Sequence, residues 1–396
     1  MRKSDGYIGI VHYGGSRTVE GIRHMLVRGI FTEAGRQRFP VYIENVAGEA
    51  SLEGCAGVIG FLWSADRAKA LAEKGIAAVN VSNTAGPLPQ VANLLSDDRA
   101  IGELAGDYLW KRGYRNFLVV GHGGTAFSRE RQEGFAVRVG TLGGSVRRIE
   151  IPLALSGSFL PPNRYLEAMW SLLGTVLMSM PMDTGIFAIN DVIAWPILRL
   201  LEDRLPERMY TCGVLGVDNS GAALDDPHKF ANLTSIIPGF ERVGREALGL
   251  LLEYGGARDA LASVERRFPP LGIKERASTA GMACEDSVVA NVMRTMWTSL
   301  RAGRRCELAE MARERSMSGR TLEHRFQAVL GRSAREVQFG FRMDLGKELL
   351  RNPTLSIAEV AEGCGYAEIS SFSNAFRKMT GMAPSEWRKT GGKHDE

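Results

Sequence analysis

The sequence predicts an α/β protein of two lobes, each built on a doubly wound parallel sheet, followed by an all-α domain with tandem helix–turn–helix motifs. Over residues 7–272, short β-rich apolar runs alternate with helical stretches, a pattern typical of parallel sheets covered by helices on both faces. Two series of these units, one before about Ser96 and one after, indicate two lobes. The last quarter of the chain instead shows one helical pattern twice.

Within the α/β part, each expected strand is a short apolar run: Tyr7–His12, Val41–Ile43, Gly57–Leu62, Ala77–Val81, Phe117–Val120, Arg147–Ile151, Gly185–Ala188 and Cys212–Val217. The expected helices between them are Val19–Arg28, Asp66–Glu73, Ala100–Arg112, Ser128–Val139, Pro162–Leu173 and Asp191–Glu202. A helix at Arg242–Glu253 and a strand at Phe268–Ile273 come late, which suggests that the chain recrosses between the lobes.

These patterns divide the chain into four parts. The lobes together take residues 1–275, with lobe 1 at about 5–96 plus 232–260 and lobe 2 at about 97–231 plus 264–275. A polar linker follows at 276–286, then the helical domain at 287–390 and a short tail at 391–396. In parallel α/β sheets, ligands bind at the carboxyl ends of the strands, so we expect a site in the crevice of the lobes.

In the helical domain, a short helix with an apolar face is followed by a turn and a second helix, and this unit occurs twice. The first copy covers residues 307–326 and ends at Gly331, and the second covers residues 356–376 and ends at Gly381. Two such units in tandem can place two helices in successive major grooves of one DNA duplex.

Further helices frame these two copies. One over Ser287–Leu300 leads into the first copy, and one over Ala334–Leu350 joins the two and ends at Asn352-Pro353. A rigid connecting helix would fix the distance between the copies. The large side chains of the second copy are expected in the core rather than on nucleic acid: Tyr366, Phe372, Phe376 and Trp387.

Positive charge is concentrated in the helical domain. From Ser287 onward the chain has 18 Lys and Arg against 13 Asp and Glu, a net charge of +5, whereas the whole chain carries +4. The preceding residues therefore carry a net charge of −1. Phosphate contacts need such an excess, although a solvated basic face without a partner would look the same.

Several functional classes lack support in the sequence. The five cysteines, Cys55, Cys212, Cys284, Cys306 and Cys364, are scattered, without a C-x-x-C pair or zinc spacing. We therefore expect no disulfide framework, no metal site and no cofactor. The start of the sequence has no signal-peptide pattern, and no stretch approaches the about 20 apolar residues of a membrane span. We expect a cytoplasmic protein with no membrane partner.

The helical domain resembles the AraC/XylS family of transcription regulators. The residues that carry the resemblance are Gly365-Tyr366, then Ser371-Phe372 through Phe376-Arg377-Lys378, and Gly381-Met-Ala-Pro384 with Trp387-Arg388. The resemblance covers about the last 110 residues, and both residue types and offsets match. It implies sequence-specific binding to double-stranded DNA with repeated half-sites, and contact with RNA polymerase if the protein is an activator.

The first 270 or so residues resemble the sugar-binding core of lac-repressor-type regulators and periplasmic sugar-binding proteins. The matching stretches are Asp98–Gly102, Arg112–Phe117, Arg131–Phe135, Asn190-Asp191, Gly213–Asp218, Thr234–Gly244 and Ser278-Thr279. A sensor of this kind joined to an AraC-type reader is the arrangement of xylose-responsive activators. The resemblance implies a small sugar effector, with a pentose such as xylose favoured, and a homodimer.

The predicted DNA-reading residues lie on the second helix of each copy. Ser318 is the expected N-cap of the first, whose exposed face presents Arg320, Thr321, Glu323 and His324. Arginine can bond guanine, glutamate can accept from cytosine and threonine can touch a thymine methyl. By offset, Arg320, Glu323 and His324 match the family's base-contacting positions, although His324 departs from the arginine often found there, and Arg325 is expected on phosphate. The alternative is that these are ordinary exposed helix residues with no role in DNA binding, since the sequence would show the same pattern.

The second reading helix is less well supplied. Its exposed face offers Ile369, Ser370, Ser373 and Asn374, of which asparagine can pair with adenine. Weaker discrimination is therefore expected here. Contacts that position the duplex without reading it should come from Arg377, Lys378, Arg388 and Lys389.

The predicted sugar-binding residues come at strand ends. Asp218 follows an apolar strand, Asn190-Asp191 follows another, and Arg131 lies near the start of a helix. Asp218, Asp191 and Arg131 match ligand-contacting positions of the resembled sensors, although Asp191 could also cap its helix. Lobe 1 would add residues after its own strands, with Phe240 a further candidate: His12, Tyr13, Ser16, Arg17 and Trp63. Trp63 could stack on a sugar or simply pack.

Two other functions compete with a sugar-responsive regulator. An α/β sugar-processing enzyme is suggested by Gly121-His-Gly-Gly124, but the sequence has no Gly-x-Ser-x-Gly turn and no nucleotide-binding glycine loop. A sugar-binding protein without transcriptional output is opposed by the attached helical domain and by the missing signal segment. We therefore expect no enzymatic activity.

Overall fold

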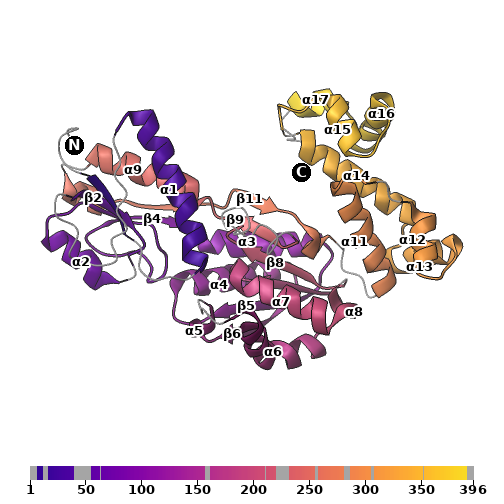
Figure 1. The fold of residues 1–396 in the computed structure, drawn as a ribbon, viewed down its shortest axis with the longest axis horizontal. Coiled ribbons are helices and arrows are strands. Elements are labelled where there is room, and N and C mark those ends of the chain that lie inside the picture. The colour runs from indigo at the N-terminus through magenta and orange to yellow at the C-terminus, as the bar shows by residue number, and fades with distance from the viewer. Residues whose placement is uncertain are drawn as a thin grey trace. The chain divides into compact units, whose positions relative to one another are not determined.

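In the computed structural model, the described residues are 7–11, 17–39, 55–62, 64–156, 161–209, 211–219, 232–254, 257–280, 286–304, 307–350 and 352–389. The chain forms two compact units, one of residues 1–205 and 214–278 and one of residues 206–213 and 279–396. Figure 1 shows the first as two α/β lobes and the second as mostly helices α11–α17.

Lobe 1 is a five-stranded parallel sheet in the order β1-β2-β3-β4-β10. Its strands are β1 (Tyr7–Val11), β2 (Cys55–Gly60), β3 (Ala78–Asn80), β4 (Ala92–Ser96) and β10 (Glu265–Phe268). The helices of this lobe are α1 (Arg17–Gln37), α2 (Ala65–Glu73), α9 (Phe240–Tyr254) and α10 (Arg258–Ala262). Helices α1 and α9 lie side by side (Figure 1), since a side chain at Gly29 would overlap the backbone of Glu241.

Lobe 2 is a six-stranded sheet in the order β11-β9-β8-β7-β5-β6, parallel except for β11 against β9. Its strands are β5 (Asn116–His122), β6 (Ser145–Ile151), β7 (Thr184–Ala188), β8 (Gly213–Val217), β9 (Thr234–Ile237) and β11 (Gly272–Lys274). The helices that follow these strands and β4 are α3 (Asp98–Lys111), α4 (Ala126–Thr141), α5 (Leu153–Ser156), α6 (Pro162–Ser179) and α7 (Asp191–Arg204). The short helix α8 (Pro206–Met209) comes next in the chain and falls in the second unit. The predicted fold class is thereby confirmed.

The late part of the chain crosses between the lobes more often than predicted. β9 belongs to the second sheet and β10 to the first, so the assignments of residues 232–237 to lobe 1 and of 265–268 to lobe 2 were wrong. The predicted strand Phe268–Ile273 is two strands because Pro269 and Pro270, which lack the N–H that a ladder needs, separate β10 from β11. The chain thus passes between the lobes at β4–α3, β9–α9 and β10–β11.

The second unit consists of two helical halves joined by one helix. The first half contains α11 (Ser287–Arg301), α12 (Leu308–Glu314) and α13 (Gly319–Leu330). The connecting helix α14 (Ala334–Leu350) has the predicted bounds, and the second half contains α15 (Ile357–Gly363), α16 (Ile369–Thr380) and α17 (Pro384–Lys389). Each half has its own apolar core, one around Phe326 and one around Phe376. In the described part of the chain, no helix is long and apolar enough to span a membrane.

Candidate ligand site and nucleic-acid interface

Arg131 is the centre of a buried charged network at the carboxyl edge of the lobe 2 sheet. Its guanidinium, on α4, donates from Nε to Asp98 Oδ1 at 2.7 Å and from Nη1 to the Ile189 carbonyl at 2.6 Å. The same Nη1 lies 3.6 Å from Asp218 Oδ1. All three charged side chains are almost fully buried. Buried charges are tolerated when they are paired in this way, so the network holds Arg131 in one place.

Close packing of α3 against α4 fixes the position of this network. A Cβ at Gly102 would lie 2.2 Å from the Arg131 carbonyl oxygen, and one at Gly134 would lie 2.2 Å from the Arg99 carbonyl oxygen. The two glycines therefore let the helix backbones touch. This contact brings Arg131 within reach of Asp98, the first residue of α3.

Asp218 follows β8 and combines three unusual features. Its φ is +98°, a region that residues with a Cβ rarely adopt, and its side chain is 2% exposed. Among the residues that the structure describes, its Oδ1 has no hydrogen-bond partner. Burial raises the pKa of Asp218 to about 6, and the charge of Arg131 opposes that rise. A strained, buried and incompletely bonded carboxylate is typical of a functional position.

Asn190 and Asp191 have separate roles at the start of α7. Asn190 is the N-cap, with Oδ1 accepting from the Ile193 N–H at 2.9 Å. Asp191 Oδ1 instead accepts from the Ser235 hydroxyl of β9 at 2.7 Å. Both side chains are buried. Asn190 therefore caps the helix in place of Asp191, and the Asp191 side chain connects the start of α7 to β9. Phe240 is also buried, as the first residue of α9.

Three neighbours of Arg131 were not among the predicted site residues. Asp98 holds its guanidinium, and the Phe127 ring lies under it, 5.2 Å from ring centroid to guanidinium carbon. The His122 ring meets Phe127 edge-on at 5.4 Å, and burial lowers the pKa of His122. These residues come from β5, α3 and α4, so only the folded structure brings them together.

Most of the lobe 1 candidates lie outside the described residues: His12, Tyr13, Ser16 and Trp63. Arg17 is the first residue of α1, but the structure does not describe its side chain. Their proposed ligand contacts stay predictions. Within the described part of the chain, no group of three or more His, Cys, Asp or Glu could hold a metal ion.

The first reading helix, α13, begins as predicted. Ser318 is its N-cap and accepts from the Thr321 N–H at 3.1 Å. Arg320, Thr321 and His324 are exposed on one side of the helix, as a groove contact requires. Leu322 and Phe326 are buried in the core of this half. The helix therefore presents a polar face to solvent and an apolar face to the unit.

Two other predicted contacts of α13 have partners inside the domain. Glu323 is half-buried, and its carboxylate accepts from the Ala334 N–H at 2.9 Å, at the start of α14. Arg325 donates to Asp286 at 3.0 Å, and Asp286 is the N-cap of α11. Any contact of these side chains with cytosine or phosphate would therefore compete with a structural bond.

The second reading helix, α16, repeats the geometry of α13 with different chemistry. Ser370, Asn374, Arg377 and Lys378 are exposed, as is Ile369, whereas Ser373 is half-buried. Phe372, Phe376 and Trp387 are in the core, with Tyr366 packed against it, as predicted. On α17, Lys389 is exposed.

Arg388, a predicted phosphate contact, is half-buried and is engaged within the domain. Its Nε donates to the Leu350 carbonyl at 3.3 Å, which satisfies the last turn of the connecting helix α14. A phosphate contact by Arg388 would have to compete with this cap.

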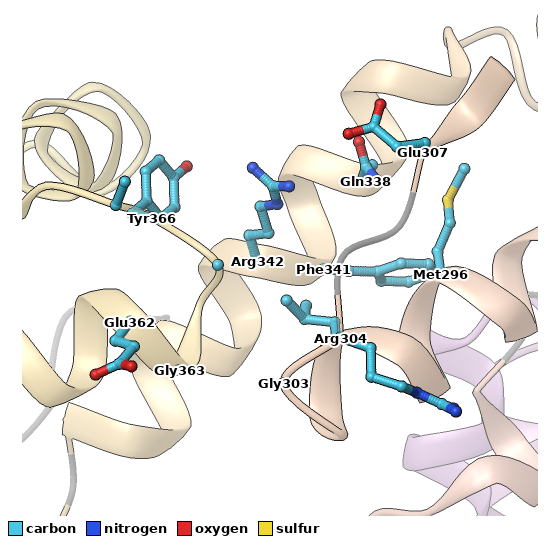
Figure 2. A pocket seen from close by; sticks show the side chains of 13 residues that line it. Met296, Gly303, Arg304, Glu307, Gln338, Phe341, Arg342, Glu362, Gly363 and Tyr366 are labelled. Carbon is cyan, nitrogen blue, oxygen red and sulfur yellow. The ribbon is translucent and has the colours of Figure 1, made fainter. Parts of the chain in front are cut away.

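A pocket of about 450 Å³ lies between the two halves of the helical unit. Figure 2 shows Phe341 and Arg342 of α14 between Met296 of the first half and Tyr366 of the second. The Arg342 guanidinium lies over the Tyr366 ring at 5.5 Å. Because guanidinium groups and carboxylates both line this pocket, its charge favours no single ligand class.

Comparison with protein families supports this division of the chain. Residues 107–279 match the model of a periplasmic binding protein-like domain. Residues 311–390 match that of a helix-turn-helix domain. The first range begins within α3 and covers the rest of lobe 2 together with α9, α10 and β10 of lobe 1, and the second covers most of α12 and all of α13–α17.

Two curated relatives match most of the chain. The xylose operon regulatory protein of Haemophilus influenzae is 26% identical over 76% of this chain and 75% of its own length. The protein of the same name from Escherichia coli K12 is 26% identical over 81% of this chain and 80% of its own length.

Solved structures share the fold. A structure described as the xylose-binding transcription activator XylR superposes with a TM-score of 0.64 at 22% identity, covering 98% of this chain and 99% of that chain. A LacI family regulator from Enterococcus faecium covers 70% of this chain and 99% of its own, with a TM-score of 0.53 and 21% identity. The chain thus joins a periplasmic binding protein-like domain to a helix-turn-helix domain, and over most of its length it is similar to two xylose operon regulatory proteins.

Proposed function

We propose that this protein is a sequence-specific DNA-binding transcription regulator, and that a small sugar held between its lobes controls DNA binding or activation. The observation that carries the sugar site is Asp218. Its Oδ1 is buried and pairs with the charge of Arg131 Nη1 at 3.6 Å, but it accepts no hydrogen bond among the described residues, and a buried acceptor without a hydrogen bond is costly. A polyol supplies hydroxyl donors, and such a donor would satisfy this atom.

The neighbours of Asp218 suit the same ligand. Arg131 can donate to ring or hydroxyl oxygens, and the partly exposed Phe127 ring, one face of which the Arg131 guanidinium covers, adds an aromatic surface beside it. Sugar sites in proteins combine a few fixed polar groups with an aromatic surface. The names of the relatives favour a pentose, xylose first, and the Enterococcus faecium structure contains ribose.

The output of the protein is DNA binding by α13 and α16. Arg320, Thr321 and His324 supply groups for reading bases, and Arg377 and Lys378 supply charge for phosphates. The helix α14 fixes the separation of the two reading helices. We infer binding as a homodimer to repeated half-sites, and contact with RNA polymerase if the sugar activates transcription.

The decisive experiment compares wild type with Asp218→Ala. We expect the variant to bind operator DNA like the wild type without sugar and to show no response to xylose, ribose or arabinose. The same sugars should raise the melting temperature of the wild type only, because a ligand that binds the folded state stabilises it. A variant that responds like the wild type would remove Asp218 from the pocket.

The raised pKa of Asp218 gives a pH test with a definite sign. The group binds its proton more tightly in the folded state, with a pKa of about 6 against an ordinary 3.8. Its contribution to stability is therefore full below about pH 4 and is lost as the pH rises through 6. We expect Asp218→Asn to flatten this part of the pH dependence of the unfolding free energy. Sugar affinity of the wild type should increase over the same interval, as the carboxylate forms.

The enzyme alternative predicts a different result. A side chain at Gly121 would meet Ser128, and one at Gly123 would meet Glu150. The Ser128 hydroxyl donates to the His122 carbonyl at 2.6 Å. This serine therefore serves a structural bond and does not lie in a nucleophile turn. We expect no turnover of sugars or esters by the full chain. Measured turnover that Asp218→Ala abolishes would favour the enzyme.

A further inference from the structure

We propose that Asn83, Glu130 and Arg267 form a latch across the two lobes, and that this latch positions Arg131 and so sets the affinity of the ligand site. The proposal rests on the proposed function, since it concerns regulation of the same site. Asn83 follows β3 and Arg267 lies on β10, so both belong to lobe 1, whereas Glu130 lies on α4 of lobe 2.

The backbone provides the first part of the latch. At the start of α4, the Ala126 N–H donates to the Thr84 carbonyl at 2.8 Å and the Phe127 N–H donates to the Asn83 carbonyl at 2.9 Å. The N-cap residue, Thr125, makes no side-chain cap. The first N–H groups of a helix need acceptors from outside the helix, and here two of them find acceptors in the other lobe. Opening the lobes would remove both.

The side chains provide the second part. Arg267 Nη1 is 2.7 Å from Glu130 Oε2, with both side chains partly buried. The Asn83 amide nitrogen donates to the same Glu130 oxygen at 2.9 Å and to Asp98 Oδ2 at 2.7 Å. Since an amide NH₂ has two hydrogens, a single nitrogen joins the ion pair between lobes to the carboxylate that holds Arg131.

These contacts make an unbroken chain from the lobe boundary to the ligand site. Arg267 holds Glu130, Asn83 connects Glu130 to Asp98, and Asp98 bonds Arg131 Nε, whose guanidinium faces Asp218. Asp98 and Arg131 are each at most 4% exposed with the latch formed, so the Asp98 carboxylate depends on Asn83 and Arg131 for its hydrogen bonds. Loss of the latch should therefore leave Arg131 less well held and the closed lobes less populated.

A population shift links this geometry to affinity. A ligand that contacts both lobes binds the closed state, and its apparent affinity falls with the fraction of molecules in that state. The proposal thus makes Glu130 and Arg267 positioning residues. They act on the ligand through Asn83 and Asp98.

The test uses the full chain with Glu130→Gln, Arg267→Met and the double variant. We expect each single change to weaken xylose binding by about tenfold and the double variant to weaken it no further, because the two residues form one interaction. The control is Glu133→Gln, one turn further along α4, which removes an ion pair to Arg99 within lobe 2. It should leave xylose affinity unchanged, and Arg267→Lys should restore most of the wild-type affinity.

A second readout does not depend on a sugar. Amide hydrogen exchange at Ala126 and Phe127 should be slow in the wild type, faster in Glu130→Gln and unchanged in Glu133→Gln. Unchanged exchange in Glu130→Gln, or additive losses of xylose affinity in the double variant, would overturn the latch. Wild-type protein that binds no pentose but shows the expected exchange would retain the latch and count against the sugar site.

Discussion

The two halves of the helical unit repeat a pair of helices of equal length, α12–α13 and α15–α16, but differ in the residues they expose. Reading helices α13 and α16 each have 12 residues, and each ends at a left-handed glycine, Gly331 with φ of 62° and Gly381 with φ of 80°. On the exposed faces, however, Arg320 and His324 of α13 correspond to Ser370 and Asn374 of α16. The repeat thus gives two helices of the same length, while their exposed side chains differ in the groups they could offer to bases under the proposed function.

The helix that follows each reading helix, α14 or α17, begins with a different residue and has a different need for a hydrogen-bond acceptor. In the first half, the Ala334 N–H needs an acceptor and receives it from Glu323. In the second half, Pro384 begins α17 and has no N–H to satisfy. Ser373, which corresponds to Glu323, therefore has no N–H of the following helix to accept a hydrogen bond from. A side chain on a reading helix can therefore be committed to the fold in one copy and not in the other.

The largest effect should come from removing a core aromatic of either half. Phe326 and Phe376 are fully buried, so replacement of each by alanine should cost about 3–5 kcal/mol of stability. Phe376 also meets Phe372 and Trp387 at ring distances of 5.5 and 5.9 Å, which predicts the greater loss for Phe376→Ala. Denaturant-dependent hydrogen exchange, followed separately in peptides of the two halves, measures both. Simultaneous loss of protection in both halves would show that they do not unfold independently.

The reading faces should differ by a smaller amount. Arg320→Ala should weaken binding to the specific operator by roughly 1–3 kcal/mol and leave non-specific binding nearly intact. Ser370→Ala, at the corresponding position of α16, should weaken specific binding by less, because weaker discrimination is expected from this helix. Titration of specific and scrambled duplexes at several salt concentrations measures both variants. An equal loss on both duplexes for Arg320→Ala would make this residue a phosphate contact.

The Glu323 cap gives the third comparison. Glu323→Ala should cost about 0.5–2 kcal/mol, the usual range for a lost helix cap. In an Ala334→Pro background, which copies the second half, the same substitution should cost much less, because the proline has no N–H to leave unpaired. Unfolding free energies of the four variants form the double-mutant cycle. Equal costs in both backgrounds would show that the Glu323 carboxylate does not act as this cap.

The smallest effect should come from the turns. Ser316 has φ of 53° in the turn of the first half, and the corresponding Gly365 of the second half has φ of 76°. A left-handed conformation costs a residue with a Cβ roughly 1–2 kcal/mol, partly offset by the greater backbone entropy of glycine. Ser316→Gly should therefore stabilise slightly, and Gly365→Ala should destabilise by about 1 kcal/mol. Melting temperatures that move in the opposite directions would contradict this reading.

Sequence patterns predicted the elements with strong local signals. The bounds of α14 and the Ser318 cap follow from the spacing of apolar residues, from Asn352-Pro353 and from a serine before a helix. β4 and β9 were missed, because strands of five and four residues lie in regions where proline, glycine and polar residues obscure the alternation. The sheet to which β9 and β10 belong depends on pairing across the chain, which no local pattern contains.

The same distinction applies to the sensor site. Asp218 follows a strand, Asp191 begins a helix and Arg131 lies near the start of one, so local patterns place all three close to the carboxyl ends of strands. The partner of Arg131 was not predictable, because Asp98 lies 33 residues away in sequence and reaches it through helix packing. The pair of Glu130 and Arg267 is separated by 137 residues. Interactions of that range are set by the arrangement of the two lobes and become visible only in the fold.

The two prolines between β10 and β11 have a consequence for how the sensor can move. Pro269 and Pro270 fix φ at the third passage between the lobes, which makes that passage a stiff strut. The second passage, after β9, contains Gly239 with φ of +87°, a more compliant joint. If the lobes open, we therefore expect the backbone angles to change mainly at Gly239 and to stay nearly fixed at Pro269 and Pro270. The lobes would then rotate about a single hinge axis, and a bound effector would favour either the open or the closed state.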